Sequence, residues 1–146
     1  MNAQQMWNKF AAQNQIGETE YQSWAFGADA DGLAELVLKG IKTGTASAYP
    51  LYEDENEPLP KVGDYSVILD SKGKGVCIIK TTKVYIAPFR EVNEEHARKE
   101  GEGDGSLEYW RKVHHEFFEK EMSESGKIFD EDMSVVCEEF ELVYVP

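Results

Sequence analysis

The sequence predicts an α+β fold in which a small, partly closed antiparallel β-barrel carries helices at its rim. The expected strands follow one another directly or through a hairpin, and most helices lie before or after them. The regular β-α-β alternation of a parallel doubly wound sheet is missing. About five strands in a chain of 146 residues suit such a barrel with one core. We therefore expect one domain over residues 1–146.

The N-terminal part of the chain predicts two helices joined by a short extended segment. Residues 3–14 place apolar side chains at helical spacing, which indicates an amphipathic helix. Residues 21–27 are typical of a short strand or turn. A second helix is expected over residues 30–39, because aspartates that can cap it precede this segment and Gly40 follows it.

Three strands are expected in the middle of the chain. Residues 43–49 form a short strand after the second helix, and residues 50–64 are a proline-rich, acidic loop. The segments 65–70 and 76–89 have the apolar composition of strands. The turn sequence at 71–75 between them predicts a hairpin.

Two helices and a last strand complete the expected order. Residues 91–101 are predicted to be helical up to the glycine. Residues 106–122 form the clearest helix of the chain, because a broad apolar face recurs at helical spacing and Ser106 can cap it. Residues 133–145 alternate partly between apolar and polar side chains, which predicts a strand.

The charge balance of the chain limits the partners that it can bind. Acidic residues number 28 against 15 basic ones, and the formal net charge is −13 at pH 7. A protein that binds long nucleic acid neutralises the phosphates with a basic stripe, which this composition disfavours. We therefore expect no DNA duplex as a partner, and any recognition of nucleic acid must come from a local site.

Other sequence features concern location and redox state. No apolar run approaches the roughly 20 residues that a membrane span needs, so we expect no membrane partner. The first residues lack a basic region followed by an apolar stretch, so we expect no signal peptide and a cytoplasmic location. Cys77 and Cys137 lie in apolar, strand-like runs and are expected to be reduced core residues.

Residues 38–47, with the sequence LKGIKTGTAS, form the first candidate site. Their spacing and flanking elements exclude a P-loop, in which a strand precedes the lysine and a helix follows it. Gly40 is expected to end the preceding helix and to place Lys42 near the negative end of the helix dipole. A partly desolvated Lys42 could also act as a base on the Thr45 hydroxyl. Such a pair needs an acid for the leaving group.

Residues 96–118 form the second candidate site. The glycine-rich junction at 101–105 joins two helices and follows no strand, which excludes a dinucleotide-binding fingerprint. Its alternating glycines and acids fit a loop whose backbone closely approaches another group. The three histidines lack supporting cysteines, so we expect no metal and no cofactor. Metal-assisted cleavage of RNA at this acidic cluster is the alternative.

Together these segments resemble the ASCH domain family of the PUA-like superfamily. GIKTGT matches the family pattern G-x-K-x-x-T. WAFG, PLPKVGDYSVIL and HARKEGEGDGSLEYWRKVHHEFF resemble a longer subgroup of predicted RNA-binding proteins. The resemblance covers about residues 20–145 and implies a PUA-like β-barrel with a cleft beside the helix that carries the lysine.

The resemblance also implies a set of site residues. Some family members are amidohydrolases that remove the acetyl group of N4-acetylcytidine, and others have been described as ribonucleases. By matching motifs, Thr45 would be the nucleophile, Lys42 its base and Glu100 the acid. The ligand would be a modified nucleoside or a short RNA. A non-catalytic RNA-binding module is the alternative.

One position departs from the family pattern. Many members carry an arginine two residues after the threonine, where this chain has Ser47, which cannot clamp a phosphate bidentately. Aromatic side chains can stack on a base. The residues expected around the ligand are Gly40, Thr43, Gly44, Ser47, Trp24, Phe26, Tyr49, Glu102, Asp104 and Arg111. The sequence does not indicate the oligomeric state.

Overall fold

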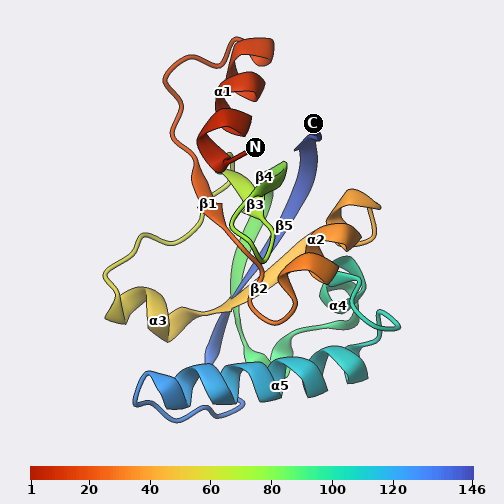
Figure 1. Ribbon diagram of the computed structural model, residues 1–146. Helices are drawn as coiled ribbons and strands as arrows, with labels where there is room; N and C mark the ends of the chain where they lie inside the picture. The colour runs from red at the N-terminus through yellow and green to blue at the C-terminus, as the bar shows by residue number, and fades with distance from the viewer.

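A computed structural model describes residues 1–146 as a curled five-stranded sheet surrounded by helices (Figure 1). The helices are α1 (Ala3–Asn14), α2 (Ala30–Leu38), α3 (Tyr49–Asp54), α4 (Glu94–Glu100) and α5 (Leu107–Glu124), with a 3-10 turn at Phe89–Glu91. The strands are β1 (Gln22–Trp24), β2 (Gly44–Ala48), β3 (Tyr65–Leu69), β4 (Gly75–Pro88) and β5 (Ser134–Tyr144). The predicted α+β class is confirmed.

The sheet forms a half-barrel with the strand order β1-β3-β4-β5-β2. All neighbouring strands are antiparallel except β1, which pairs with β3 in parallel. The pairing of β4 with β5 shifts register twice, between Ile78 and Ile79 and between Thr81 and Lys83. Such irregularities increase the bend and twist of a strand, so they help these two long strands to curl. The predicted hairpin of β3 and β4 is confirmed.

Helices cover the two ends of the half-barrel (Figure 1). At one end, α1 packs Met6, Trp7 and Phe10 against Val67 of β3 and Ile78 of β4. An asparagine capping box fixes the start of this helix. The apolar face of α1 therefore closes the end of the sheet at which both chain termini lie.

At the opposite end, α5 crosses below the strands (Figure 1). Its side chains Trp110, Phe118 and Met122 pack in one cluster with Val135 and Cys137 of β5. The Ser106 hydroxyl accepts a hydrogen bond from Tyr109 N, so the predicted cap is confirmed. Trp110 is thus a core residue, and its ring is not free to stack on a ligand.

The segment after β2 differs from the expectation. Residues 49–54 were expected to lie in a strand end and a loop, but they form the short helix α3. Pro50 lies in the first turn, where its missing N–H costs no hydrogen bond. Leu51 packs against the core, and Asp54 pairs with Lys127. Tertiary contacts therefore stabilise a helix in a segment whose composition favours a loop.

The two cysteines agree with their expectation. Cys77 and Cys137 are buried and unpaired, as predicted. None of the helices combines the length and the apolar character that crossing a membrane would require.

Candidate functional site

The end of α2 directs Lys42 into the protein. Gly40 adopts a left-handed conformation with φ +75°, which glycine tolerates best. Behind this turn, Ile41 N and Lys42 N both donate to Leu36 O and close the end of the helix. The prediction that Gly40 ends the helix and places Lys42 is confirmed. The lysine side chain is only 1% exposed.

Lys42 ends in a buried ion-pair network. Its Nζ atom lies 3.2 Å from Glu100 Oε1 and 3.0 Å from Glu102 Oε2. A buried ammonium group is costly unless it is paired and hydrogen-bonded, and here it has both carboxylates. The two candidate segments thus meet at this point, through residues that lie 58 and 60 positions apart in the chain.

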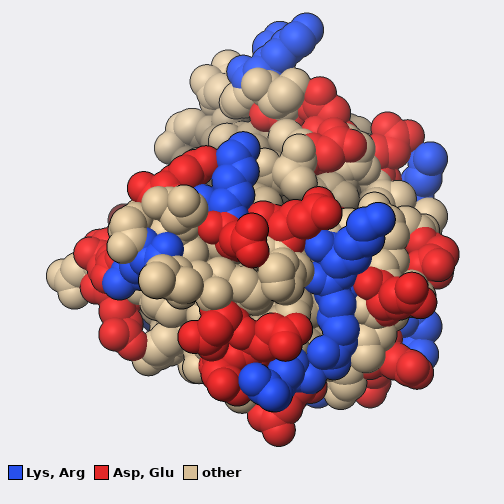
Figure 2. All heavy atoms as spheres, turned by 90° about the horizontal axis from the view of Figure 1, so that it is seen from below, with Lys and Arg blue, Asp and Glu red and all other residues tan.

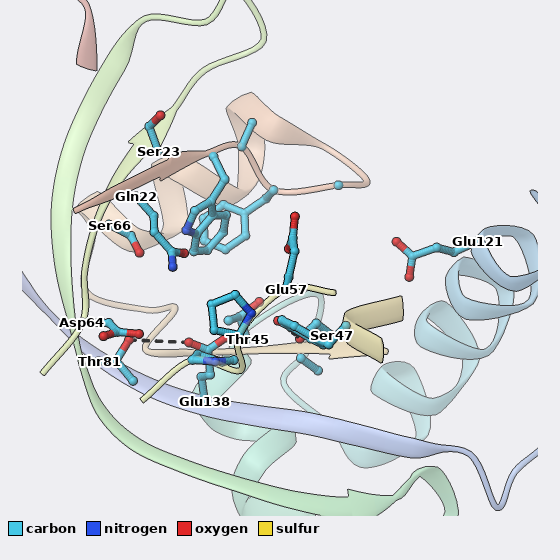
Figure 3. Close-up of a pocket in the computed structure, with 18 of the residues that line it drawn as sticks. Gln22, Ser23, Thr45, Ser47, Glu57, Asp64, Ser66, Thr81, Glu121 and Glu138 are labelled. Carbon is cyan, nitrogen blue, oxygen red and sulfur yellow. Dashed lines mark hydrogen bonds between the residues drawn. The ribbon is translucent and has the colours of Figure 1, made fainter. Parts of the chain in front are cut away.

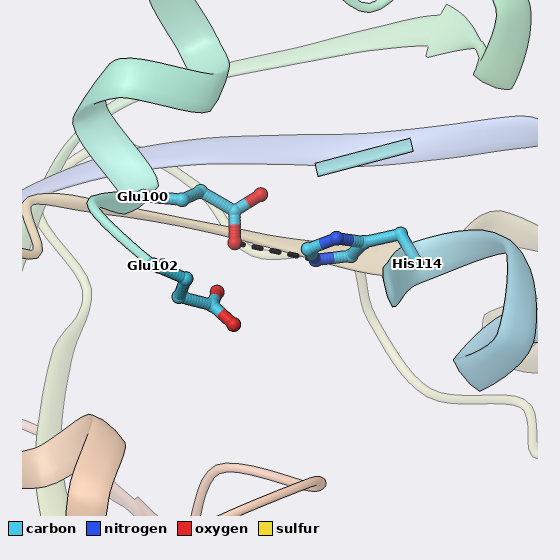
Figure 4. A group of neighbouring side chains, drawn as sticks. All are labelled: Glu100, Glu102 and His114. Carbon is cyan, nitrogen blue, oxygen red and sulfur yellow. Dashed lines mark ion pairs between the residues drawn. The ribbon is translucent and has the colours of Figure 1, made fainter. Parts of the chain in front are cut away.

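Glu100 is the centre of this network, which also contains His96, Trp110 and His114. His96 Nε2 lies 2.7 Å from Glu100 Oε2, to which Trp110 Nε1 also donates. His114 Nε2 lies 3.4 Å from the other carboxylate oxygen (Figure 4). Burial raises the pKa of Glu100, but the Lys42 charge and the histidine hydrogen bonds outweigh it and hold the pKa well below its usual range.

His114 forms hydrogen bonds on both sides of its ring. Nδ1 lies 2.9 Å from Trp110 O, and Nε2 faces Glu100. Because a carbonyl and a carboxylate both accept hydrogen bonds, this environment favours the doubly protonated imidazolium. Burial lowers the pKa of His114, but the hydrogen bond to Glu100 and the charges of Glu100 and Glu102 together raise it above 6.5.

This raised pKa predicts a pH dependence of stability. Protonated His114 stabilises the fold fully below its unfolded pKa of 6.5, and this contribution is lost as the pH rises through the higher folded value. The free energy of unfolding of the wild type, relative to that of His114→Gln, should therefore fall as the pH rises above 6.5. Urea unfolding of both proteins over a pH series measures this difference. A constant difference would contradict the assignment.

Three side chains at this point, from the end of α4, the junction after it and α5, are of types that can bind a metal ion. Ligand atoms of Glu100, Glu102 and His114 lie within 4.8 Å of one another (Figure 4). The Lys42 ammonium already contacts both carboxylates. A divalent ion at this position would have to compete with that bound cation, so the donor set fits an ion pair better than a metal centre.

Thr45 lies elsewhere, in a cavity of about 660 Å³ within the curled sheet (Figure 3). Neither Lys42 nor Glu100 lines this cavity. Phe26 separates the two regions: it lines the cavity, and its ring centroid lies 5.2 Å from Lys42 Nζ. The structure thus brings Lys42 and Glu100 together, but Thr45 lies in the cavity and not beside them. The cavity is lined by Gln22, Ser23, Trp24, Ala25, Phe26, Gly27, Thr45, Ala46, Ser47, Tyr52, Glu57, Pro58, Pro60, Asp64, Ser66, Thr81, Phe117, Glu121 and Glu138.

Glu138 is the cavity residue with the most perturbed acidity. It pairs with Thr45 across β2 and β5, so the two side chains share a face of the sheet. Burial raises the pKa of Glu138 to about 7, and the negative charge of Asp64 adds to this effect, while a hydrogen bond from Thr81 opposes it. A carboxyl group with such a pKa can accept or donate a proton near neutral pH.

Sequence reasoning did not identify Glu138 or the other acids of the cavity. The available signal was an acidic residue inside the apolar run of β5, at a strand position that could face the concave side. Of the residues expected around the ligand, Trp24, Phe26 and Ser47 line the cavity, and the others do not. Ser47 Oγ lies 2.8 Å from the Tyr52 hydroxyl.

The other expected ligand residues serve structural contacts. Thr43 donates through N and Oγ1 to Lys99 O, and Gly44 allows α4 and β5 to approach closely. Asp104 accepts a hydrogen bond from Ser106 N, and Arg111 donates to the carbonyls of Arg90 and Val92. Tyr49 lines a separate, shallow hollow beside the end of α5.

Comparison with known proteins places the chain in a family. The family model described as ASCH domain matches residues 22–144. The crystal structure of an ASCH domain from Lactobacillus crispatus JV V101 is 35% identical, with a TM-score of 0.91, over 97% of this chain and 93% of that chain. Protein EF3133 of Enterococcus faecalis V583, assigned to the family model DUF984, is 36% identical, with a TM-score of 0.91, over 99% and 89%.

A more distant structure shows the same fold only. The hypothetical protein PH0355 is 20% identical, with a TM-score of 0.58, over 85% of this chain and all of that one. The search of curated proteins found no match. Both the matched family model and the full-length similarity of the two bacterial structures lead to one conclusion: this chain belongs to the ASCH domain family.

Proposed function

We propose that this ASCH domain binds a single modified nucleoside in the cavity of the half-barrel. The observation that supports this most directly is the cavity itself, with a volume of about 660 Å³ that suits a ligand of nucleoside size. Trp24 and Phe26 meet edge to face in its wall, with ring centroids 5.0 Å apart. An aromatic wall beside hydroxyl and amide groups is suited to stacking on a base and reading its edge.

The charges favour a nucleoside over a polynucleotide. No lysine, arginine or histidine lines the cavity. On the face seen in Figure 2, basic side chains form a short band that acidic side chains flank on both sides. Binding of a long RNA requires a continuous basic surface to neutralise phosphates, which this arrangement does not support.

The first test is nucleoside binding by calorimetry, with cytidine and N4-acetylcytidine as probes. Replacing Trp24 by alanine removes a stacking surface, and base–aromatic stacking contributes about 1–3 kcal/mol. We therefore expect Trp24→Ala to weaken binding by about fivefold to a hundredfold. Trp24→Phe, which keeps an aromatic ring, should retain most of the affinity. Absence of binding to the wild type would refute the proposed function.

A second proposed function is hydrolysis of an amide on the bound nucleoside. The observation that favours it is the pairing of Thr45 with Glu138 across β2 and β5 in one cavity. Glu138 would take the proton of the Thr45 hydroxyl while its oxygen attacks the amide carbonyl. The protonated Glu138 would then give this proton to the leaving amine, and water would hydrolyse the acyl-threonine ester.

Release of acetate from N4-acetylcytidine tests this reaction. Thr45→Val should abolish the release while the protein still binds the nucleoside. Glu138→Gln should lower the rate by about a hundredfold or more, as expected for loss of a general base. Lys42→Met provides the comparison with the base that the family motif implies. If Lys42→Met removes turnover in a folded protein and Glu138→Gln does not, the lysine is the base.

A further inference from the structure

Four carboxyl groups of the cavity have no basic partner. Glu57, Asp64, Glu121 and Glu138 reach it from the segment after α3, the turn before β3, α5 and β5 (Figure 3). None of them forms an ion pair. Their neighbour Glu139, on the other face of β5, contacts both Lys99 at 2.8 Å and Lys83 at 3.7 Å. The lack of compensating charge is therefore a property of the cavity and not of the strand.

Ser66 gives a second, independent indication of a ligand in the same cavity. Its side chain lines the cavity (Figure 3), and the residue is only 6% exposed. Its hydroxyl forms no hydrogen bond within the protein, and its oxygen stays accessible from the cavity, where a partner can reach it. A polar ligand in the cavity would supply that partner.

Two of these carboxyl groups, Asp64 and Glu138, repel each other. Burial and the charge of Asp64 raise the pKa of Glu138 to about 7, against the opposing hydrogen bond from Thr81. Burial raises the pKa of Glu121, and so do the charges of Glu55 and Glu124, which lie outside the cavity lining. A cation placed among these groups would relieve this repulsion and favour their ionised forms. A phosphate placed there would increase it.

We infer that the cavity selects a nucleoside whose base carries a positive charge, such as one methylated or protonated on a ring nitrogen, and rejects nucleotides. This inference rests on the proposed nucleoside binding and specifies its substrate class. The Glu138 carboxylate would contact the charged edge of the base, and Trp24 would face the ring. A cytosine ring that accepts a proton during amide hydrolysis carries the same positive charge. The same placement of Glu138 and Trp24 would therefore favour both the binding of a cationic base and the second proposed function.

A pair of isomers tests the inference by calorimetry. 3-Methylcytidine is cationic at neutral pH, whereas 5-methylcytidine has the same substituent on carbon and is neutral. At a pH above 7, where Glu138 ionises, we expect 3-methylcytidine to bind at least about tenfold more tightly. Cytidine 5′-monophosphate should bind more weakly than cytidine. Below pH 7 the preference for 3-methylcytidine should shrink as Glu138 becomes protonated, and binding of the neutral isomer should change little.

Two variants test whether the charge of Glu138, and not the loss of any one acidic residue, causes the preference for 3-methylcytidine. Glu138→Gln should lower the affinity for 3-methylcytidine by a much larger factor than the affinity for 5-methylcytidine, so that most of the preference is lost. Glu116→Gln, an exposed change on α5 that does not line the cavity, should leave the preference intact. Equal binding of the two isomers to the wild type overturns the inference but keeps the proposed function. Binding of neither isomer, nor of cytidine or N4-acetylcytidine, overturns both.

Discussion

Replacing Glu100 by alanine should destabilise the protein by about 3–5 kcal/mol, the cost of breaking a buried ion pair from one side. The change leaves the Lys42 ammonium, which is 1% exposed, without its most buried partner. It also removes the acceptor of His96 Nε2 and Trp110 Nε1. Urea unfolding monitored by tryptophan fluorescence measures the loss.

The control for Glu100→Ala is a change in the same helix, α4. Glu95 is in the same helix and pairs with Lys99, but its side chain is 61% exposed, so Glu95→Ala should change stability by less than about 0.5 kcal/mol. The double variant Lys42→Met, Glu100→Leu should recover part of the loss, because it removes both charges. A cost of Glu100→Ala no greater than that of Glu95→Ala would show that the network does not stabilise the fold.

These variants also separate two roles of the family motif. Lys42 and Glu100 are buried against each other, and neither lines the cavity. If they act mainly by placing β2, a folded Lys42→Met protein should still bind nucleosides in the cavity. If Lys42 acts on the substrate, the release of acetate from N4-acetylcytidine will stop while the fold and the binding persist. The binding and turnover of Lys42→Met must therefore be measured together with its stability, which shows whether the variant is folded.

The elements of the fold could be predicted mainly because their signals are local. Apolar spacing and caps mark α1, α2 and α5, and the turn before Gly75 marks the β3–β4 hairpin. The helix α3 was missed because its proline and acids have the composition of a loop, and its stability comes from packing of Leu51. The parallel pairing of β1 depends on contacts between distant segments, which local patterns do not encode.

The candidate site could be predicted only in part, for reasons of geometry. The contact of Lys42 with Glu100 follows from a resemblance between whole motifs. Lys42 precedes β2, whereas Thr45 lies within β2 and faces the cavity together with Glu138. A turn joining their side chains was expected, but β2 starts at Gly44 and leaves little room for one. The cavity acids come from four segments whose convergence depends on the curl of the sheet.

The glycine after Glu100 should be far less replaceable than the glycine before Lys42. Gly101 and Gly40 both follow helices and have φ values of +65° and +75°. Alanine in this left-handed region costs about 1–2 kcal/mol at either position. At Gly101 the added Cβ would also press on the carbonyl oxygen of Ile41 and lie 2.8 Å from Ile41 Cγ2, whereas at Gly40 it meets nothing within 4 Å. We expect Gly101→Ala to cost about 3 kcal/mol or more and Gly40→Ala about 1 kcal/mol.

The excess cost at Gly101 has a specific structural meaning. Ile41 precedes Lys42, and Gly101 lies between Glu100 and Glu102, so the close approach of these two backbones sets the position of the ion pairs. Relieving the clash would move α4 away from the start of β2 and lengthen the contacts of Lys42 Nζ. Urea unfolding of the two alanine variants isolates the cost of the clash with Ile41, because the penalty for alanine in the left-handed region is common to both. Equal costs for the two would mean that the chain can separate at this point without loss, and that the buried pairs do not depend on the glycine-rich junction.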